Sequence, residues 1–396
     1  MNPGDVAWLL ASSALVLLMT PGLALFYGGM VRTRHVLNML MMNLVAIPIV
    51  TLLWVAITYS LMFDESGNGV LGGLGSAGLS GLSTSQLLGA TLNLMFAIIT
   101  VALISGAVAD RMKFSAWVAF AAAWSLVVYP LIGRMLFFSS GALRDIGAQD
   151  FAGGLVVHVS AGASAIALVT VLGPRRSHRK EQIRPHSLPL TMLGAALLWF
   201  GWFGFNAGSA GGANATAVTA FLATQIAAGA GMAAWLAVEW RLTGSPTLLG
   251  AVSGVVAGLV AVTPAAGYVS PLSAVAIGAV GGVAAYWAVR AKYRFPFDDA
   301  LDVVGIHLVA GLLGSLLVAV FADSAYGGSA DGLLSGSAGL VWPQLASTIV
   351  VAVIAFALTW IIAKALDAGI GLRVTERQEL EGLDLTQHEE RAYSPE

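Results

Sequence analysis

Two stretches of the sequence place an aspartate and a histidine in otherwise apolar surroundings. Residues 150–162 read DFAGGLVVHVSAG and residues 299–311 read DALDVVGIHLVAG, so both fit Asp, seven residues, His, two residues, Ala, Gly. The histidines, His158 and His307, are the side chains that could do chemistry. A neutral imidazole donates one hydrogen bond and accepts another, and its unperturbed pKa of about 6.5 lets it relay protons. The repeated spacing predicts a paired role for them.

A histidine alone in an apolar helix is more often a satisfied core residue than a functional one. An ionisable group inside a membrane is nevertheless a functional candidate by default, and two at mirrored positions favour function. A metal site is not favoured, because two imidazoles in a chain without cysteine are too few ligands for a closed zinc site. We predict neither metal nor cofactor. For the aspartates near the helix starts we favour capping of free N–H groups over catalysis; these are Asp150, Asp298, Asp299 and Asp302.

The composition indicates a protein that lies in lipid. Of the 396 residues 58% are hydrophobic and only 10% are charged, whereas soluble domains carry about 25% charged residues. The formal net charge of −2 gives no reason to expect a nucleic-acid partner, and the absence of cysteine excludes disulfides, thiolate metal sites and cysteine nucleophiles. The first apolar run follows MNPGDV without a basic segment, so we expect it to stay as a helix rather than to be cleaved as a signal peptide.

The apolar runs predict an all-α membrane protein with eleven transmembrane helices. A membrane-spanning helix needs about 20 apolar residues, and the eighth candidate, which ends near Val262, is short for this task. The candidates start near Ala7, Val36, Leu87, Ser115, Phe151, Leu188, Asn214, Thr247, Ser273, Asp302 and Gln344.

The distribution of positive charge is consistent with this count. All but two of the 19 Lys and Arg residues lie after odd-numbered spans, including the basic group Arg175, Arg176, Arg179, Lys180 and Arg184; the exceptions are Arg134 and Arg144. Positive residues favour the cytoplasmic side. We therefore predict that the N-terminus lies outside and the C-terminus inside.

The histidine stretches also predict an internal symmetry. They lie at the starts of spans 5 and 10, and because five spans separate them, the two helices must run in opposite directions. This indicates an inverted repeat (halves about 7–172 and 188–321) with an extra helix at about 344–364, together forming a domain 1–364, followed by a cytoplasmic tail 365–396. Eight residues of helix rise about 12 Å, and half of the hydrocarbon core is about 15 Å. Both histidines should therefore meet near the midplane, where such repeats build their sites.

Longer stretches of the chain are similar to a known family. They are PGLALFYGGMVRTRHVLN (21–38), DFAGGLVVHVSAG, GWFGFNAGSAGGAN (201–214), PTLLGAVSGVVAGLVAVTPAAGYV (246–269), DDALDVVGIHLVAGLLGS (298–315) and GLRVTERQELEGLDLTQHEERAY (371–393). They resemble the ammonium transporter (Amt) branch of the Amt/Rh family. The resemblance implies a homotrimer of eleven-helix protomers, each with its own pore, in the plasma (cytoplasmic) membrane.

The resemblance also implies roles for single residues. The twin pore histidines match His158 and His307, and the phenylalanine pair that closes the outer mouth matches Phe96 and Phe205. The serine of the outer recruitment site matches Ser209, a residue that favours the Amt over the Rh branch. A tryptophan near the pore matches Trp202, and a buried aspartate near the mouth matches Asp150.

One departure from the family pattern concerns the recruitment site. The family usually has a tryptophan after the fourth span's Tyr-Pro region, but here the sequence reads VVYPLIGRMLFFSSGAL, so Phe137 or Phe138 must take its place. Phe gives a weaker cation–π attraction than Trp. We therefore expect a weaker outer cation site, weakened further by the positive charge of Arg134.

The expected function is ammonium transport, not enzymatic catalysis. Ammonium would be recruited outside, lose its proton at the mouth and cross as ammonia past neutral imidazoles, with net ammonium movement. A neutral gas or small-solute channel and an ammonium sensor are the alternatives; an appended signalling domain, which a sensor would need, is not expected in a tail of about thirty residues. An intramembrane enzyme is disfavoured because no nucleophile–base pair or cofactor motif is present. The acidic tail could be solvated and disordered, but it resembles the family's regulatory tail, which implies packing on the cytoplasmic face and coupling to a PII-type signalling protein.

Overall fold

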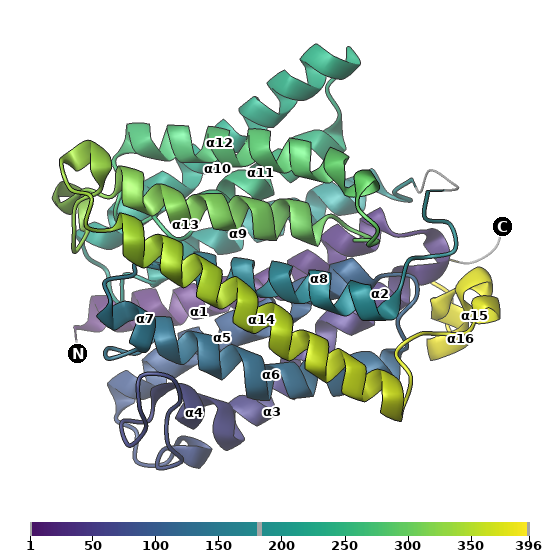
Figure 1. Cartoon of the computed structure of the whole chain (residues 1–396), viewed down its shortest axis with the longest axis horizontal. Helices are drawn as coiled ribbons and strands as arrows, with labels where there is room; N and C mark the ends of the chain where they lie inside the picture. Colours follow the sequence, from purple (N-terminus) through teal and green to yellow (C-terminus); the bar gives the residue numbers. More distant parts are fainter. Residues whose placement is uncertain (1, 180–183, 394–396) are drawn as a thin grey trace.

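The computed structural model describes residues 2–179 and 184–393, so Lys180 of the basic group lies outside the described residues. The long helices run roughly along one common axis (Figure 1). Apart from an isolated antiparallel bridge between Met112 and Arg373, the described residues form no β-structure. The prediction of an all-α protein is confirmed.

The helices follow the predicted spans closely. The first half contains α1 (Pro3–Met30), α2 (Val36–Leu44), α3 (Ala46–Leu53), α4 (Tyr59–Phe63), α5 (Thr84–Ile104), α6 (Phe114–Phe137), α7 (Ala142–Asp145) and α8 (Ser160–Leu172). Residues 188–321 contain α9 (Leu188–Gly208), α10 (Ala215–Thr243), α11 (Leu248–Val262), α12 (Pro271–Ala291) and α13 (Ala310–Phe321). The extra helix is α14 (Val341–Gly369), and the tail contains α15 (Glu376–Glu381) and α16 (Leu383–His388). Three π-helical turns, Trp54–Thr58, Gly154–Val159 and Val304–Val309, continue into neighbouring helices.

Ten helical segments of the described chain are long and apolar enough to cross a membrane. The eighth predicted span is α11, an apolar helix of 15 residues, which is shorter than the range of about 17–25 residues for a spanning helix. That α11 makes an eleventh crossing therefore stays a prediction. The extra helix α14 extends to Gly369, so residues 365–369 continue the helix rather than begin the tail.

Local capping explains where many helices begin. Ser83 and Gln86 form a reciprocal capping box at α5, and the Asn214 side chain accepts the Ala217 N–H at 3.0 Å at the start of α10. Such side chains satisfy N–H groups that have no partner inside the helix. Two helical segments begin later than predicted, at Gly154 instead of Phe151 and at Val304 instead of Asp302. Their first N–H groups are capped by Asp150 and Asp299, which lie several residues before each segment in the sequence.

Small residues let the helices approach closely. A Cβ on Gly194 of α9 would lie 2.2 Å from the backbone nitrogen of Phe26, and one on Gly201 would lie 2.6 Å from the Leu15 carbonyl oxygen of α1. Glycine at these positions therefore sets the α1–α9 spacing. Packing through small residues is the usual way for helices to associate in lipid.

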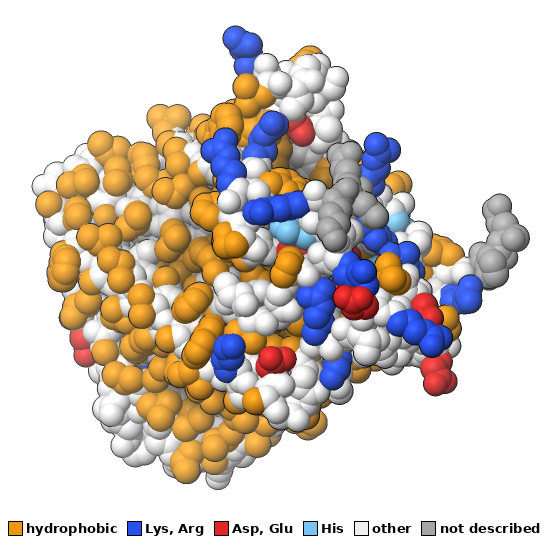
Figure 2. All heavy atoms as spheres, turned by 45° about the vertical axis from the view of Figure 1, so that its right-hand side comes forward, with side chains coloured by type: hydrophobic (Ala, Val, Ile, Leu, Met, Phe, Trp, Pro, Cys, Tyr) orange, Lys and Arg blue, Asp and Glu red, His pale blue; other side chains and the backbone are white. Residues whose placement is uncertain are grey.

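The two ends of the bundle differ in charge. The start of α1 lies at one end, and the tail helices α15 and α16 lie at the other (Figure 1). Figure 2 shows Lys and Arg side chains gathered toward the tail end, while hydrophobic side chains cover much of the remaining face. This asymmetry agrees with the alternation of charge along the sequence.

Candidate functional site

The two histidines of the repeat meet inside the bundle. His158 and His307 are 2% and 4% exposed, their Nδ1 atoms lie 3.3 Å apart, and their ring centroids are 5.3 Å apart with an interplanar angle of 21°. Each ring is carried by a π-helical turn that leads into a regular helix, α8 or α13. Such π turns are rare and occur often at functional sites.

The aspartates of the repeat hold the starts of these π turns. The carboxylate of Asp150 accepts the N–H groups of Gly153 at 3.1 Å, Leu155 at 2.9 Å and Val156 at 3.0 Å. The mirrored Asp299 accepts those of Val303 and Val304 at 3.1 and 2.7 Å. These contacts are the capping role expected from the sequence. The spacing D-x7-H therefore describes a capped π turn with a histidine on it.

The two histidine-bearing helices cross antiparallel through small residues. A Cβ on Gly162, four residues after His158, would lie 2.5 Å from Cβ of Leu308, next to His307. A Cβ on Gly311, four residues after His307, would lie 3.2 Å from Cβ of His158. Each helix thus presents a glycine to the other helix at the histidine level, and this close approach brings the imidazoles together.

Aromatic rings cover the histidine pair on one side. Phe96 and Phe205 stack at a centroid distance of 4.2 Å with an interplanar angle of 25°, and Phe205 lies 6.0 Å from His158. Trp202 stacks on His158 at 5.4 Å, and its indole N–H donates to Oγ1 of Thr263 at 2.9 Å. Thr263 was not singled out from the sequence, since it lies outside every local motif.

Beyond the phenylalanine pair lies an open cavity of about 750 Å³, at the end of the bundle where α1 begins. We call it the Ser209 cavity. Its walls include Ser209, Phe96, Phe137 and Asp150. The Ser209 hydroxyl donates to the Phe205 carbonyl at 2.9 Å, which leaves its oxygen able to accept a hydrogen bond from a ligand.

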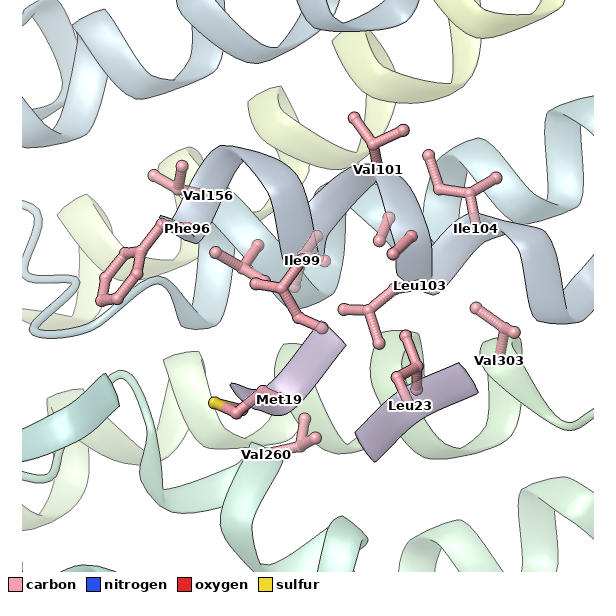
Figure 3. Close-up of a cluster of buried hydrophobic side chains, with 14 of the residues drawn as sticks. Met19, Leu23, Phe96, Ile99, Val101, Leu103, Ile104, Val156, Val260 and Val303 are labelled. Atoms are coloured by element: carbon pink, nitrogen blue, oxygen red, sulfur yellow. The ribbon is translucent and has the colours of Figure 1, made fainter. Parts of the chain in front are cut away.

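On the other side of the phenylalanine pair lies a narrow space of about 10 Å³, which we call the histidine cavity. A volume of this size holds about one water-sized molecule. Phe205, both histidines and aliphatic side chains line it. The aliphatic side chains include Met19 and Leu23 of α1 and Ile99 and Leu103 of α5, which Figure 3 shows within a larger buried apolar cluster.

The structure separates the two candidates for the missing tryptophan. Phe137 lines the Ser209 cavity and lies 6.4 Å from Phe96. Phe138 does not line this cavity; its ring lies under the guanidinium of Arg134 at 3.3 Å. Of the two, only Phe137 joins the other predicted mouth residues.

Arg134 lies outside the wall of the Ser209 cavity. Its side chain is buried and donates to the carbonyl oxygens of Asn68 at 2.8 Å and Asp64 at 2.7 Å, away from the cavity. Arg134 is therefore not among the residues that line the Ser209 cavity. The physical reason is the loop after α4, whose carbonyl groups hold the guanidinium inside the protein. The other cation of this end, Arg144, does line the cavity.

Within the described part of the chain, no group of three or more His, Cys, Asp or Glu side chains is arranged to hold a metal ion. The groups that the structure brings together are the imidazole pair, the aromatic rings and the hydroxyl groups around them. Such groups can bind a small cation by its charge and a small amine by hydrogen bonds.

Comparison with known proteins places this geometry in a family. Residues 7–393 match the family model described as "Ammonium Transporter Family". The chain is 44% identical over 394 residues to the ammonium transporter Amt1 of Archaeoglobus fulgidus, covering 100% of both chains. It is also 44% identical over 404 residues to the ammonium transporter of Bacillus subtilis, covering 99% of each.

Solved structures show the same fold. The crystal structure of Candida albicans Mep2 superposes with a TM-score of 0.90 at 32% identity, covering 96% of this chain and 88% of that one. A structure described as "Sensor Amt Protein" gives a TM-score of 0.91 at 28% identity, covering 97% and 98%. With its buried twin histidines, its apolar spanning helices and this similarity along nearly its whole length, the chain belongs to the ammonium transporter family of multi-pass membrane proteins.

Proposed function

We propose that the protein recruits ammonium in the Ser209 cavity, where ammonium gives its proton to water on the outer side of the phenylalanine pair, and conducts ammonia past His158 and His307, with the proton crossing separately. The observation that carries this proposal is the order of the compartments. A polar cavity, a stacked pair of phenylalanine rings and a narrow space beside two imidazoles follow one another. A bare cation at the centre of a bilayer costs several kcal/mol or more, so a cation that can lose its proton has an advantage on this path.

Recruitment uses groups that replace water around a cation. The rings of Phe96 and Phe137 offer their faces, each worth roughly 0.5–2 kcal/mol, and the oxygen of Ser209 accepts an N–H bond. Phenylalanine attracts a cation less strongly than tryptophan does. Phe137 therefore gives a weaker cation site than a tryptophan at this place would. Potassium gains the same attraction but has no proton to leave behind, so the stacked rings exclude it by the cost of removing its water.

The histidine pair suits a neutral amine. The contact between the two Nδ1 atoms requires one ring to carry its proton on Nδ1 and the other to accept it. In neutral rings, the first then has a bare Nε2 and the second an Nε2–H. Together they offer one acceptor and one donor to a molecule in the histidine cavity. Nε2 of His158 is buried and makes no hydrogen bond within the described chain, which leaves it available to ammonia.

The topology and the oligomeric state that we propose rest on the sequence. We propose eleven membrane crossings with the N-terminus outside, which turns the Ser209 cavity outward and the tail toward the cytoplasm. A homotrimer in the plasma membrane and a PII-type partner at the tail face complete the proposal. The packing of α15 and α16 against the connections at the basic end of the bundle supports a regulatory surface there.

Purified protein in proteoliposomes tests the function. An ammonium pulse should give a saturable current, and His158→Ala and His307→Ala should each change transport or its selectivity over potassium. Thr170→Ala is the control on α8, because that hydroxyl only donates to Ala167 of the same helix. Unaltered transport and selectivity in both histidine variants would overturn the mechanism.

Two other functions predict different results in the same assay. A neutral gas channel would give no saturable current but would speed ammonia equilibration. A sensor is favoured by one observation, the similarity to the solved "Sensor Amt Protein"; it would bind ammonium in the Ser209 cavity without net flux.

A further inference from the structure

The Ser209 cavity contains a positive side chain that neither the sequence motifs nor the transport mechanism uses. Arg144 is exposed and lies among the residues that line the cavity. Its Nη1 donates to the carbonyl oxygen of Phe137 at 3.5 Å, a long bond that places the guanidinium beside the predicted recruitment ring.

The backbone around Arg144 is held firmly. The short helix α7 starts at Ala142, whose N–H donates to Gly69 O at 2.8 Å. The next side chain, Leu143, is buried, and its carbonyl accepts the Ala148 N–H at 3.1 Å. The side chain of Arg144 therefore extends from an anchored backbone position on the cavity wall.

Other groups of the cavity experience this charge. Burial raises the pKa of the Tyr268 hydroxyl to about 12, the negative charge of Asp150 acts in the same direction, and the charge of Arg144 opposes it. Arg144, Asp150 and Tyr268 all line the cavity. The carboxylate of Asp150 is engaged with three backbone N–H groups, which lowers its capacity to neutralise the guanidinium. Ser209 and Phe137 line the same cavity as Arg144.

We propose that Arg144 sets the affinity of the outer site for cations by electrostatic repulsion. The inference rests on the proposed recruitment of ammonium in the Ser209 cavity and adds a residue that determines its strength. A fixed positive charge at the mouth lowers the local concentration of ammonium and of every other monovalent cation. With Arg144 present, the site therefore saturates at a higher ammonium concentration than it would with the aromatic ring and the hydroxyl group alone.

The expected effect is moderate and depends on salt. We take unit charges on the order of 7 Å apart and a dielectric constant between about 40 and about 80, the value of bulk water. Coulomb's law then gives roughly a three- to tenfold change in affinity. Screening lengths are about 30 Å at 0.01 M salt and about 10 Å at 0.1 M. Removal of the charge should therefore matter most at low ionic strength.

Charge variants at one position test this proposal. Arg144→Gln should lower the KM for methylammonium roughly three- to tenfold in 0.01 M salt with little change in the maximal rate, and Arg144→Glu should lower it further. Arg144→Lys keeps the charge and should keep the wild-type KM. The difference between the wild type and Arg144→Gln should shrink as salt is raised. Asp145→Asn is the matched control, since Asp145 is exposed and lies outside the cavity lining; it should change KM much less.

Each outcome decides the proposal. A KM of Arg144→Gln equal to that of the wild type at low salt would overturn it, and so would a lysine variant that behaves like the glutamine variant. If the wild type itself gives no saturable uptake, the transport function fails. Calorimetric titration of methylammonium binding to the same variants then still measures whether Arg144 weakens cation binding in the cavity.

Discussion

A buried ion cluster lies next to the second histidine turn, in the connections at the basic end of the bundle. Arg175 donates from Nε and Nη2 to the two carboxylate oxygens of Asp298, both at 2.8 Å, and from its backbone N–H to the same carboxylate at 2.8 Å. Nη1 reaches Asp110 at 3.4 Å. Asp298 precedes Asp299, the cap of the turn that carries His307. The cluster therefore fixes the start of that turn to the connection after α8.

The pKa of Asp298 gives the sign of its pH effect. Burial acts to raise it, but the hydrogen bonds and charge of Arg175, with the charge of Arg111, outweigh burial and hold the pKa well below its usual range. A carboxyl group with a lowered folded-state pKa stabilises the fold above its unfolded value of about 3.9. This contribution is lost as the pH falls through the folded pKa, and it is constant between roughly pH 5 and 8.

Asp298→Asn should therefore destabilise the protein at neutral pH. It removes the two-pronged carboxylate contact from a buried guanidinium, which keeps the longer contact to Asp110; breaking a buried ion pair costs roughly 3–5 kcal/mol. Thermal melting in detergent at pH 7 measures the loss, and the difference from the wild type should narrow toward pH 3. Glu381→Gln is the control, because the Arg377–Glu381 pair is exposed and such pairs contribute about 1 kcal/mol or less. Equal melting temperatures for Asp298→Asn and the wild type at pH 7 would contradict the role of the cluster.

At the scale of elements, the crossing of α8 and α13 determines the distance between the imidazoles. The crossing is close because each segment presents a glycine there, Gly162 to Leu308 and Gly311 to His158. Both histidines lie on the π turns that precede α8 and α13, and their rings stack at a centroid distance of 5.3 Å. A change in either the glycine contacts or the π turns would therefore move an imidazole.

Gly162→Ala should disturb this crossing. Its methyl group would lie 2.5–2.8 Å from Cβ, N and Cα of Leu308, so the π turn that carries His307 must shift. Overpacking of this kind costs roughly 1–3 kcal/mol, and we expect a lower melting temperature together with strongly reduced ammonium transport. Gly229→Ala on α10 is the matched control, since its methyl group would meet nothing within 4 Å and alanine favours a helix by up to about 1 kcal/mol. Wild-type transport by Gly162→Ala would show that the helix spacing does not set the site.

At the scale of the whole molecule, the tail is part of the bundle. The Asp384 side chain accepts the Asn38 N–H of α2 at 2.9 Å, and the Gln387 side chain accepts the Phe114 N–H at the start of α6 at 3.2 Å. Gly382, between α15 and α16, has φ of +106° and lies against Arg34, where a Cβ would meet side-chain and backbone atoms at 2.6–2.9 Å. One tail helix thus caps two membrane helices, and α6 carries Phe137 at its other end.

Loss of these caps should release the tail. We expect Asp384→Ala with Gln387→Ala to lower stability by about 0.5–2 kcal/mol per cap. The variant should also speed cleavage of residues 370–393 in limited proteolysis and alter transport through α6. Glu390→Ala, at an exposed position of the same segment, should leave cleavage and melting close to those of the wild type. Unchanged proteolysis of the double variant would mean that the caps do not hold the tail.

The sequence by itself determined the local features. Runs of apolar residues predicted helices that the structure contains. The D-x7-H repeat predicted that both histidines lie near the middle of the bundle, because helix rise and membrane thickness limit where such residues can lie. Capping by Asp150 also followed from residue type and position. These properties depend on neighbours along the chain, so the sequence contains the information needed to predict them.

Only the tertiary structure decided which side chains meet across the bundle. It placed Phe137 rather than Phe138 in the Ser209 cavity, held Arg134 inside the loop after α4 and left Arg144 at the mouth. It also showed the π turns, the bond of Trp202 to Thr263 and the docking of the tail. Each of these depends on the rotation and spacing of helices, which are set by the packing of remote small residues. A local sequence pattern carries no information about that packing. Phe137 and Phe138 therefore could not be distinguished from the sequence, and only the fold shows which of them lines the cavity.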